Sequence, residues 1–540
     1  MIAKNGKGVF GGVAVGTIKI FSDTLKTEKR FVNDTEGEIK RLKEAVEKAV
    51  DQLEALYKKT LEQVGKDEAQ IFEIHKMMIT DNEFVSDIEE KIKMGVNAEA
   101  AVQETGEKFS QRFKSLNDAY MSQRAVDVKD ISQRLIKILS GKEDENTENG
   151  EKYIIAAKDL TPSQTMRMDR ESVAGFVTEY GSENSHTSIL ARMMNIPAII
   201  GIKGIADEIY DGKSAAIDGG SGTLYIEPNE TTLKRLHDKR KKYEGEKELL
   251  QKFKGRETVT KDGKKIMLYA NISNMTDLDM VLANDAEGIG LFRSEFIFLQ
   301  RQTYPSEEEQ FKIYKKAVEK MNGKRVIIRT LDIGADKQAD YFDIPKEENP
   351  ALGYRAIRIC LDRPYIFKTQ LRAILRAAAY GKAAVMFPMI CTFEELKKAK
   401  EILKEAGKEL EKEGINYCRN IEVGIMIETP AAAVISDVLA EECDFFSIGT
   451  NDLTQYTLAA DRQNSKVTES FDIRNESVLR LIKMTAQNGH KKGIWVGICG
   501  ELGADTSLTA DFIKWGIDEL SVSPVWILEL RRNILEIEAK

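Results

Sequence analysis

The spacing of hydrophobic residues changes character along the chain. Residues 1–22 carry short apolar runs separated by glycines (GVF, GG, VAVGTIKIF), which predicts two strands joined by a turn. Residues 23–145 contain almost no glycine or proline, and apolar residues recur at helical spacing between charged ones, as in IKRLKEAVEKAVDQLEALYKKTLEQV. This second pattern predicts four or more helices joined by short loops, and therefore an all-helical unit.

Strand patterns return after residue 145. The segments YIIAA, AGFVTEY, PAIIGI and SAAIDGGSGTLYI are typical of strands, and SHTSILARMMN between them predicts a helix. The simplest arrangement is one α/β domain made of residues 1–22 and 146–228, with the helical unit inserted between its two pieces. Residues 229–260 are highly charged with little apolar stripe, which predicts a solvated linker helix rather than a nucleic-acid contact.

Short apolar strands alternate with amphipathic helices over residues 261–540. The predicted strands are KIMLYANI, GIGLFRSEF, RVIIRTLDIG, AAVMFPMI, EVGIMIET, FFSIGTND, WVGICGE and ELSVS. Eight such units in this length predict a (β/α)8 barrel; a doubly wound sheet is the alternative and fits less neatly. The expected fold class is therefore a multidomain α/β protein.

Composition narrows the class of protein further. The 540 residues are 42% hydrophobic and 31% charged, which excludes a disordered or low-complexity chain. The net charge of −8 argues against a nucleic-acid binder, although a local basic pocket for a small anion remains compatible with it. No run approaches the roughly 18 apolar residues of a membrane span, the first residues lack a signal-peptide pattern, and the five cysteines form no CxxC pair. A reducing cytoplasm is the expected location.

Polar residues follow the predicted barrel strands, where barrel active sites lie. They are Arg293, Arg329, Glu428, Asn451, Asp452, Arg462 and Cys499. Converging guanidinium groups bind phosphate and carboxylate in a bidentate manner, which favours a small anionic substrate. Glu428 and Asp452 offer the oxygen ligands that Mg²⁺ prefers, and the amide of Asn451 suits a phosphate. The set indicates a phosphorylated small acid bound together with Mg²⁺.

Two further residues suggest chemistry. Cys499 lies between glycines in GICGE, where it is either a buried apolar residue or a catalytic acid at the barrel mouth. His186, in YGSENSHTSILAR, falls in the first turn of a predicted helix, whose amides and dipole favour an anion. An imidazole there suits a nucleophile that becomes phosphorylated, and an ordinary surface or capping histidine is the alternative. Phosphate-binding glycine loops of the GxxxxGK[ST] type are absent from the sequence.

Nine segments, in order along the chain, resemble those of one family. They are SHTSILAR, PAIIG, LFRSEFIF, IRTLDIGADK, NPALGYRAIR, MFPMI, IETPAA, SIGTNDLTQYTLAADR and GICGE. The chain thereby resembles Enzyme I, the phosphoenolpyruvate–protein phosphotransferases of the bacterial sugar phosphotransferase system. The resemblance implies a swivelling phosphohistidine domain (1–22 and 146–228), an inserted HPr-binding domain (23–145), a linker helix (229–260) and a dimerising phosphoenolpyruvate barrel (261–540).

The resemblance also implies residue roles. His186 matches the histidine phosphorylated on Nε2, and Cys499 matches the acid that protonates the enolate of pyruvate. Glu428 and Asp452 match the Mg²⁺ ligands. The residues that match those holding phosphoenolpyruvate are Arg293, Arg329, Asn451, Asp452 and Arg462. The implied reaction is Mg²⁺-dependent transfer from phosphoenolpyruvate to His186 and then to the carrier HPr, as the first step of sugar uptake, in a cytoplasmic homodimer. Residues 67–78 match the region of the family's docking helix.

One departure and three alternatives accompany this interpretation. Gly181-Ser182-Glu183-Asn184 replaces the Gly-Gly-Arg-Thr that the family has before its Ser-His pair. Phosphoenolpyruvate synthase and pyruvate phosphate dikinase share both domains, but they also need an ATP-binding domain for which we expect no space. A non-catalytic regulatory paralogue is motivated by the departure. An active paralogue with a special carrier, such as a nitrogen-regulatory type, would be expected to carry an extra N-terminal sensory domain.

Overall fold

In the computed structural model the chain divides into two compact units, Met1–Glu246 and Lys247–Lys540. The structure describes residues 1–21, 27–63, 66–115, 119–141, 152–160, 172–181, 188, 191, 196–275, 277–299, 301, 303–334, 340–345, 347–462, 467 and 470–538. Within these ranges no helix has both the length and the apolar character that crossing a membrane requires.

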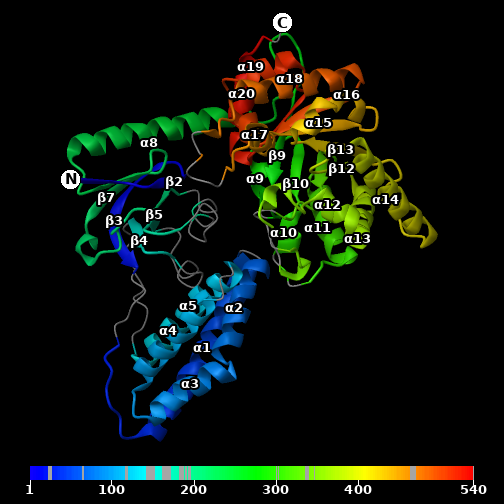
Figure 1. The fold of residues 1–540 in the computed structure, drawn as a ribbon. Coiled ribbons are helices and arrows are strands. Elements are labelled where there is room, and N and C mark those ends of the chain that lie inside the picture. The colour runs from blue at the N-terminus through cyan, green and yellow to red at the C-terminus, as the bar shows by residue number, and fades with distance from the viewer. Residues whose placement is uncertain are drawn as a thin grey trace. The chain divides into compact units, whose positions relative to one another are not determined.

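The first unit contains a mixed eight-stranded sheet with the order β1-β8-β7-β3-β4-β5-β6-β2 (Figure 1). Its strands are β1 (Ile2–Asn5), β2 (Lys7–Phe10), β3 (Val13–Phe21), β4 (Tyr153–Ala157), β5 (Val173–Thr178), β6 (Ala198–Ile200), β7 (Ser214–Asp218) and β8 (Thr223–Ile226). β3 pairs in parallel with β4, in the register Thr17↔Tyr153, so the two ends of the helical segment meet in one sheet. The sequence pattern predicted the other strands but not β1, whose residues IAKN carry few apolar side chains.

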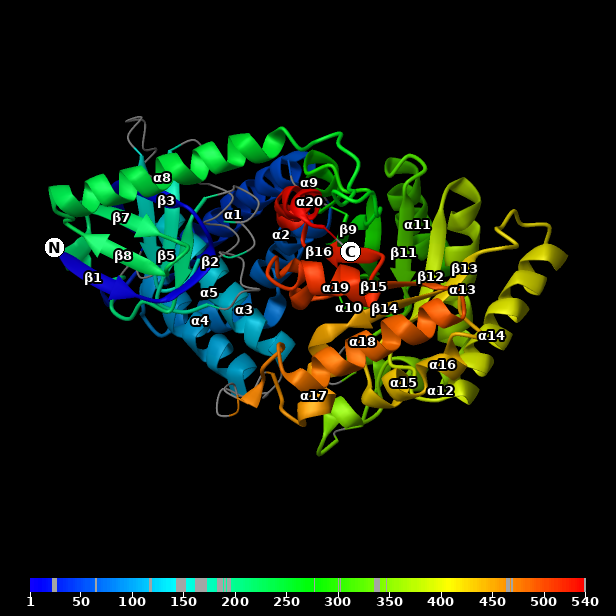
Figure 2. The ribbon, with the colours of Figure 1, turned by 90° about the horizontal axis from the view of Figure 1, so that it is seen from above.

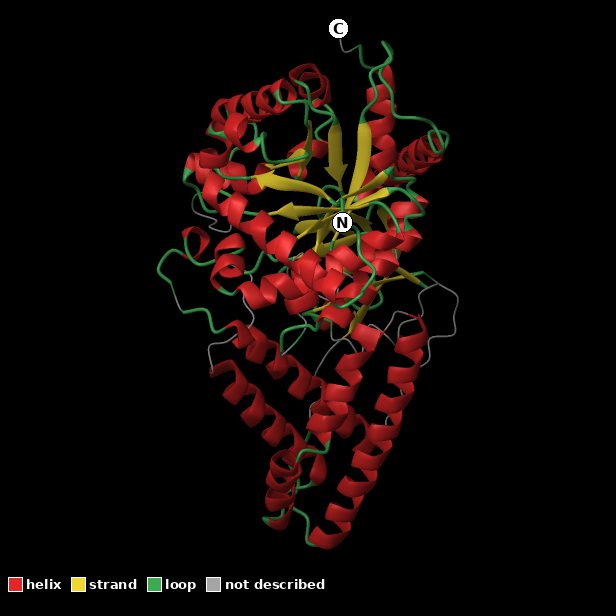
Figure 3. Cartoon of the chain, turned by 90° about the vertical axis from the view of Figure 1, so that its right-hand side faces the viewer, coloured by secondary structure: helices red, strands yellow, loops and turns green. Residues whose placement is uncertain are grey.

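Between β3 and β4 the described residues form five helices, as predicted, and Figure 3 draws this part as red helices. The helices are α1 (Thr35–Gln63), α2 (Lys66–Ile79), α3 (Asn82–Lys93), α4 (Ala98–Ser115) and α5 (Ala119–Leu139). Their apolar stripes meet in one core that includes Leu42, Phe72, Ile88 and Leu135, all fully buried. Burial of these stripes is what holds the helices together, since isolated helices of such length are marginal in water.

A partly buried carboxylate, 15% exposed, joins α3 to α4. Asp87 accepts hydrogen bonds from Thr105 Oγ1 at 2.7 Å and from the ammonium groups of Lys91 and Lys108. Burial by itself would raise the pKa of Asp87, but Lys108, Lys91 and Thr105 outweigh it and hold the pKa well below its ordinary value. The ionised form of Asp87 therefore stabilises the folded helices.

The charged segment after β8 forms α8 (Glu230–Gln251), and it is not wholly solvated as the sequence suggested. Leu236 is buried against Val13 and Ala216 of the sheet. Lys239 Nζ lies 2.5 Å from Asp218 Oδ2 at the end of β7. The prediction of a solvated linker helix is wrong for this face, where Leu236 and the partly buried Leu233 pack on the sheet. So few apolar positions do not form a visible stripe in the sequence.

The second unit is a closed barrel of eight parallel strands, which confirms the barrel over the doubly wound alternative (Figure 2). The strands are β9 (Met267–Ile272), β10 (Gly288–Arg293), β11 (Arg325–Arg329), β12 (Ala383–Phe387), β13 (Glu422–Ile427), β14 (Phe445–Gly449), β15 (Trp495–Cys499) and β16 (Glu519–Val522). Each strand pairs with the next in sequence, and β16 closes the ring against β9 in the register Glu519↔Met267. All eight predicted strands are present.

Helices surround this ring on its outer side (Figure 2). They are α9 (Asp277–Ala283), α10 (Glu295–Leu299), α11 (Glu307–Lys320), α12 (Ile357–Asp362), α13 (Pro364–Ala377), α14 (Phe393–Lys412), α15 (Pro430–Val434), α16 (Ser436–Leu439), α17 (Thr450–Leu458), α18 (Glu476–Lys491), α19 (Thr509–Trp515) and α20 (Ile527–Glu536). In α14 a capping box between Thr392 and Glu395 starts the helix, and Leu396, Leu403 and Leu410 form its buried stripe.

Side chains fill the interior of the barrel, so the ring is a packed core and not a pore. Tyr269, Ile327, Met386 and Phe445 belong to this inner cluster. At the amino-terminal end Trp495 stacks on Phe445, with ring centroids 4.5 Å apart. The packed interior leaves the carboxyl end of the ring as the place for a ligand.

A buried arginine fastens the last helix to the rest of the barrel. Arg531 on α20 has no exposed surface, and its guanidinium donates to Asp285 Oδ2 at 2.7 Å and to the Asp285 carbonyl at 2.6 Å. It also donates to Thr258 Oγ1 at 3.1 Å and to the Phe253 carbonyl at 3.2 Å. One side chain thus joins three segments of the barrel.

A candidate active site at the carboxyl end of the barrel

The residues predicted at the strand ends lie on one rim of the barrel. Arg293 and Arg329 end β10 and β11, and Cys499 ends β15. Glu428 follows β13 directly. Asn451 and Asp452 lie in the first turn of α17 after β14, and Arg462 follows that helix. Because the strands are parallel, their carboxyl ends share this rim.

Arg329 is buried between two carboxylates. Its Nη2 lies 2.7 Å from Glu295 Oε1 and 3.0 Å from Asp332 Oδ2. Burial alone would lower the pKa of the guanidinium, but the charges of Glu295 and Asp332 raise it. Its Nε makes no hydrogen bond within the described residues, so one buried N–H remains for an anion.

The structure adds a residue that the strand-end argument missed, Arg355. It lies in the segment between β11 and α12, and the next residue, Ala356, takes a φ of 51° while its N–H donates to the Ile333 carbonyl at 2.9 Å. That backbone conformation is costly for a residue with a side chain, so the surrounding contacts must hold it in place. The only signal in the sequence was the segment NPALGYRAIR, which is not at a strand end.

Arg355 shares its carboxylate with Arg329. Its Nη2 lies 2.9 Å from Asp332 Oδ1, and its Nη1 donates to the Tyr456 hydroxyl at 3.0 Å. Its Nε, like that of Arg329, makes no hydrogen bond to any residue that the structure describes. Asp332 therefore holds two guanidinium groups side by side, in the arrangement that binds phosphate or carboxylate.

Arg462 approaches the same group of residues. Its Nη1 lies 3.9 Å from Asp452 Oδ1, and the Arg355 Nη1 lies 4.0 Å from the same oxygen. The side chain of Arg462 is 30% exposed, so it lies nearer the mouth than Arg329 and Arg355, which are about 5% exposed. Three guanidinium groups thus converge from separate segments of the chain.

Glu428 and Asp452 supply oxygen atoms on the same rim. Glu428 is fully buried; its Oε1 accepts the Met389 N–H at 2.7 Å, while its Oε2 has no hydrogen-bond partner among the described residues. Asp452 Oδ1 is likewise without a hydrogen bond there. Burial, and then the charges of Asp452 and Asp332, raise the pKa of Glu428 to about 8. A cation beside both carboxylates would supply the missing positive charge, so the pair fits a divalent metal ion.

Two carboxylates do not enclose a metal ion on their own. Within the described ranges, no three or more His, Cys, Asp or Glu side chains form a group that could hold one. Mg²⁺ ordinarily keeps several waters and binds through one or two carboxylates together with substrate phosphate. The arrangement is therefore of the kind that is completed by a phosphorylated substrate.

Cys499 is buried beside these groups. It is 3% exposed, its Sγ donates to the Ile448 carbonyl at 3.7 Å, and burial raises the pKa of the thiol to about 12. The next residue, Gly500, has a φ of 142°, and a Cβ there would overlap Thr450 Oγ1. The sulfur thus carries its proton at neutral pH, as a general acid must.

The predicted nucleophile, His186, lies outside the residues that the structure describes. Thr187 lies outside them as well, as do Ser182, Glu183 and Asn184 of the segment that replaces the family's motif. The structure does describe Ser188, which is buried.

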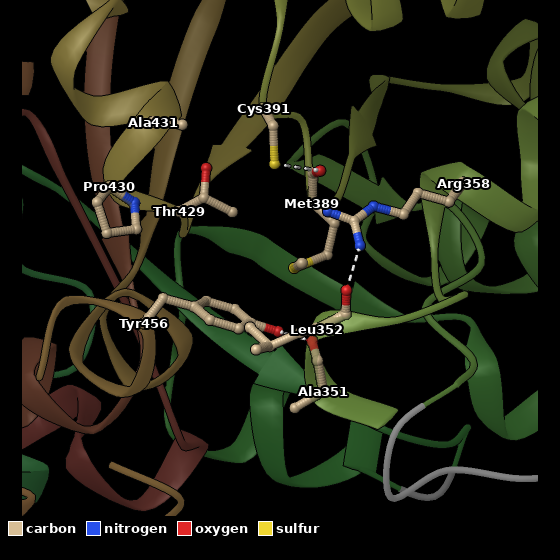
Figure 4. Close-up of a pocket in the computed structure, with 9 residues that line it drawn as sticks. All are labelled: Ala351, Leu352, Arg358, Met389, Cys391, Thr429, Pro430, Ala431 and Tyr456. Atoms are coloured by element: carbon tan, nitrogen blue, oxygen red, sulfur yellow. Dashed lines mark hydrogen bonds between the residues drawn. The ribbon is translucent and has the colours of Figure 1, made fainter. Parts of the chain in front are cut away.

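A pocket of about 240 Å³ lies beside the rim (Figure 4). Ala351, Leu352, Arg358, Met389, Cys391, Thr429, Pro430, Ala431 and Tyr456 line it. Arg358 donates to the Leu352 carbonyl at 2.7 Å, and the Cys391 thiol to the Met389 carbonyl at 3.5 Å (Figure 4). The lining is mostly apolar, so the neighbouring arginines suit a multiply charged anion better than this pocket does.

Comparison with known proteins agrees with this chemistry. Three domain families match the chain: the N-terminal domain of PEP-utilising enzymes over residues 5–124, their mobile domain over 149–222 and their PEP-binding domain over 247–539. The fold and the anion-binding rim thus define a PEP-utilising enzyme.

Curated relatives narrow the class. Proteins named phosphoenolpyruvate-protein phosphotransferase are 42% identical in Priestia megaterium over 97% of this chain and 92% of theirs, and 42% in Bacillus subtilis over 98% and 94%. One from Geobacillus stearothermophilus is 44% identical over 97% and 92%. The chain belongs to the phosphoenolpyruvate-protein phosphotransferase family, Enzyme I. Its activity is phosphotransfer from phosphoenolpyruvate.

Proposed function

We propose that the chain transfers the phosphoryl group of phosphoenolpyruvate to Nε2 of His186 and then to a histidine of the carrier HPr, as the first step of sugar uptake. The observation that carries the substrate-binding part is the pair of buried guanidinium groups, Arg329 and Arg355, each with an unpartnered Nε within the described residues. Such buried donors are costly unless an anion uses them. We also propose a cytoplasmic homodimer that dimerises through its barrel.

Substrate binding divides among the rim residues. Arg329 and Arg355 neutralise the phosphoryl group, because both are buried and fixed by Asp332. Arg462, nearer the mouth, holds the carboxylate, and Arg293 and the amide of Asn451 complete the binding set. Guanidinium groups fixed before the substrate arrives lose little entropy when they bind it.

Glu428 and Asp452 are the proposed ligands of Mg²⁺, on which enzymes of this family generally depend. The support is the unpartnered oxygen that each carboxylate offers within the described residues. The ion, when bound, neutralises charge on the phosphoryl oxygens and on the enolate. Asp452 belongs both to the proposed metal ligands and to the substrate-binding residues, since its Oδ1 also faces the guanidinium groups of Arg355 and Arg462.

The chemical step then follows from the residues. His186 Nε2 forms a bond to phosphorus as the bond from phosphorus to the enol oxygen breaks, and the electron pair of that bond goes to the enolate of pyruvate. Cys499 gives its proton to C3 of the enolate; this S–H bond breaks, a C–H bond forms, and a thiolate remains. The imidazole proton on Nδ1 leaves to solvent.

The helical part supplies the proposed docking surface for HPr. Met77 on α2 is 72% exposed, whereas His75 on the same helix is fully buried, with its Nε2 3.2 Å from Asp127 Oδ1 on α5. The contact to α5 fixes the orientation of α2 and leaves an apolar side chain in water. Such an exposed residue on a rigid helix suits a partner with an apolar patch.

The test is phosphoryl transfer to purified HPr. Protein, Mg²⁺ and phosphoenolpyruvate labelled in its phosphoryl group are mixed with HPr, and the label is followed on both proteins. We expect label on the chain first and on HPr second, and loss of both when Mg²⁺ is chelated. Label on the chain that never moves to HPr would contradict the carrier assignment, and undiminished labelling after chelation would contradict the role of Mg²⁺.

A further inference from the structure

A fully buried glutamine has no part in the chemistry described so far. Gln370 lies on α13 and has no exposed surface. It is the one polar side chain among the buried residues of that helix, which the structure describes throughout. A buried amide destabilises a core unless its polar atoms find partners, so the partners of Gln370 explain why this position is not apolar.

The side-chain amide of Gln370 is fully engaged. Its Oε1 accepts the Leu331 N–H at 2.9 Å, and its Nε2 donates to Ser294 Oγ at 2.9 Å and to the Tyr314 hydroxyl at 3.0 Å. Because a main-chain N–H can only donate, the contact to Leu331 fixes which end of the amide is the oxygen. The partners belong to the segment after β11, the segment after β10, and α11. One side chain therefore joins the ends of two neighbouring strands to an outer helix.

Ser294 extends these bonds to Arg329. Its Oγ donates to the Arg329 carbonyl at 2.6 Å while it accepts from Gln370. Ser294 directly follows Arg293 at the end of β10, and it precedes Glu295, whose carboxylate lies 2.7 Å from Nη2 of Arg329. Two consecutive residues thus hold Arg329, one at its main chain and the other at its guanidinium group.

The bond to Leu331 holds the chain at the point where the sheet ends. The Thr330 N–H still donates to a carbonyl of β12 at 2.9 Å, and Leu331 is the next residue. Asp332 follows, and its carboxylate holds the guanidinium groups of both Arg329 and Arg355. The buried amide thus replaces the strand ladder as the partner of the main chain here. It fixes the main chain on both sides of Thr330.

The network ends on α11, which packs against α13 outside the ring (Figure 2). The Tyr314 hydroxyl donates to Gln310 Oε1 at 3.3 Å, and Gln310 Nε2 donates to the Pro305 carbonyl at 3.1 Å. Burial raises the pKa of Tyr314 above its ordinary value, so the hydroxyl keeps the proton for this bond. Gln310 is as fully buried as Gln370, but neither of these two partners belongs to the rim.

We infer that Gln370 is a positioning residue for the arginines that bind the phosphoryl group. This inference rests on the proposed role of Arg329 and Arg355 in binding phosphoenolpyruvate. Gln370 does not touch substrate; it fixes the main chain that carries Arg329 and Asp332, and Asp332 in turn holds Arg355. Guanidinium groups held in place before the reaction stabilise the charge that develops on the transferring phosphoryl group without having to reorganise.

The experiment compares the same substitution at the two buried glutamines. Gln370→Leu keeps a side chain of similar size and removes all three hydrogen bonds. Gln310→Leu is the matched control, because it alters the same network at its outer end. Ser294→Ala removes the bond to the Arg329 carbonyl, and it provides the test if Gln370→Leu fails to fold.

The measured reaction is phosphorylation of the chain by labelled phosphoenolpyruvate in a single turnover, stopped by rapid quench, which needs no carrier. Its dependence on the concentration of phosphoenolpyruvate gives a rate constant at saturation and a half-saturating concentration. Thermal unfolding of each protein measures its stability separately.

For Gln370→Leu we expect a rate constant at saturation about 10- to 100-fold lower, with a smaller change in the half-saturating concentration, because a displacement of about 1 Å at a reacting group can cost about 100-fold. Ser294→Ala should lower the same rate constant by less. Gln310→Leu should lower the melting temperature about as much as Gln370→Leu, since both leave buried polar groups unpaired, but its rate constant should stay within about twofold of the unmodified protein.

Two results would overturn the inference. An unchanged rate constant in a folded Gln370→Leu protein, or in Ser294→Ala if that protein does not fold, shows that the amide does not position the arginines. An equal slowing in Gln310→Leu shows that lost stability is responsible instead. An unmodified protein that takes up no phosphoryl group would overturn the proposed function itself, and it is distinguished because no turnover is then seen in any of the proteins.

Discussion

Arg355→Lys is the substitution that tests the rim most sharply. The guanidinium of Arg355 uses Nη2 for Asp332 and Nη1 for Tyr456, at 2.9 and 3.0 Å, and keeps its Nε for the substrate. Lysine preserves the charge but has a single nitrogen, which cannot serve two protein partners and an anion in this fork geometry. The variant therefore removes one directed hydrogen bond to the phosphoryl group without leaving Asp332 unpaired.

The size of the effect follows from that one bond. A hydrogen bond to a charged group contributes about 1.5–3 kcal/mol, which converts to a kcat/KM about 10- to 150-fold lower. The loss should fall on kcat as well as on KM, because negative charge on the transferring oxygens is neutralised by this side chain during the reaction. The melting temperature should change little, since the ammonium group can still pair with the buried carboxylate of Asp332.

Pyruvate release, coupled to NADH oxidation by lactate dehydrogenase in the presence of HPr, measures both constants. Arg358→Lys is the matched control: it lies three residues further on, and its guanidinium bonds to the Leu352 and Gly353 carbonyls. Its kcat/KM should stay within about twofold of the unmodified protein, as is usual for changes away from the reacting atoms. An Arg355→Lys protein with unchanged kinetics, or an Arg358→Lys protein with an equal loss, would refute the placement of the substrate beside Arg355.

Two predictions concern stability. Asp87→Asn should lower the melting temperature of the helical part at neutral pH. The pKa of Asp87 is lower in the folded than in the unfolded state. Its contribution to the free energy of unfolding is therefore present above the unfolded-state pKa of about 4 and is lost as the pH falls towards the folded-state pKa. Thermal unfolding from pH 7 to pH 3 should therefore show the two proteins converging, with the exposed Glu83→Gln as a control that shifts little, and a difference independent of pH would contradict the assignment. Arg531→Met should lower the free energy of unfolding by about 1.5–3 kcal/mol, because it removes the charged hydrogen bond to Asp285, a 30% exposed carboxylate that keeps Lys324 at 3.7 Å. Denaturant titration against the partly exposed neighbour variant Arg532→Met checks this, and equal losses in both would contradict a special contribution of the Arg531–Asp285 ion pair.

The strands of the barrel could be predicted because each is a short apolar run that ends in a polar residue. That pattern is local, and it survives in the sequence since both faces of a parallel strand are buried. β1 was not predicted, because its pairing with β8 depends on residues more than two hundred positions away and its own side chains are mostly exposed. Leu236 on α8 was missed for a similar reason, because two or three buried positions do not make a periodic stripe.

The site was predicted where it follows a strand and missed where it does not. Arg329 and Glu428 are visible from the sequence as charges that end apolar runs. Arg355 is brought to them by a loop and by the positive φ of Ala356, and no local pattern encodes either. Glu519 begins the predicted strand ELSVS, and nothing in that segment shows that Gly290 and Gly497 on other strands leave room for its buried carboxyl group. Contacts between distant segments are the part of the site that periodicity alone does not reveal.

The central claim is that the barrel rim delivers the phosphoryl group of phosphoenolpyruvate to His186. The most direct measurement is the mass of the intact protein and of its peptides after incubation with phosphoenolpyruvate and Mg²⁺, with ATP in parallel and with a His186→Ala variant. The account predicts an acid-labile gain of one phosphoryl group on His186 with phosphoenolpyruvate, none with ATP, and none in the variant. A gain with ATP instead, or one retained in the His186→Ala protein, would contradict it.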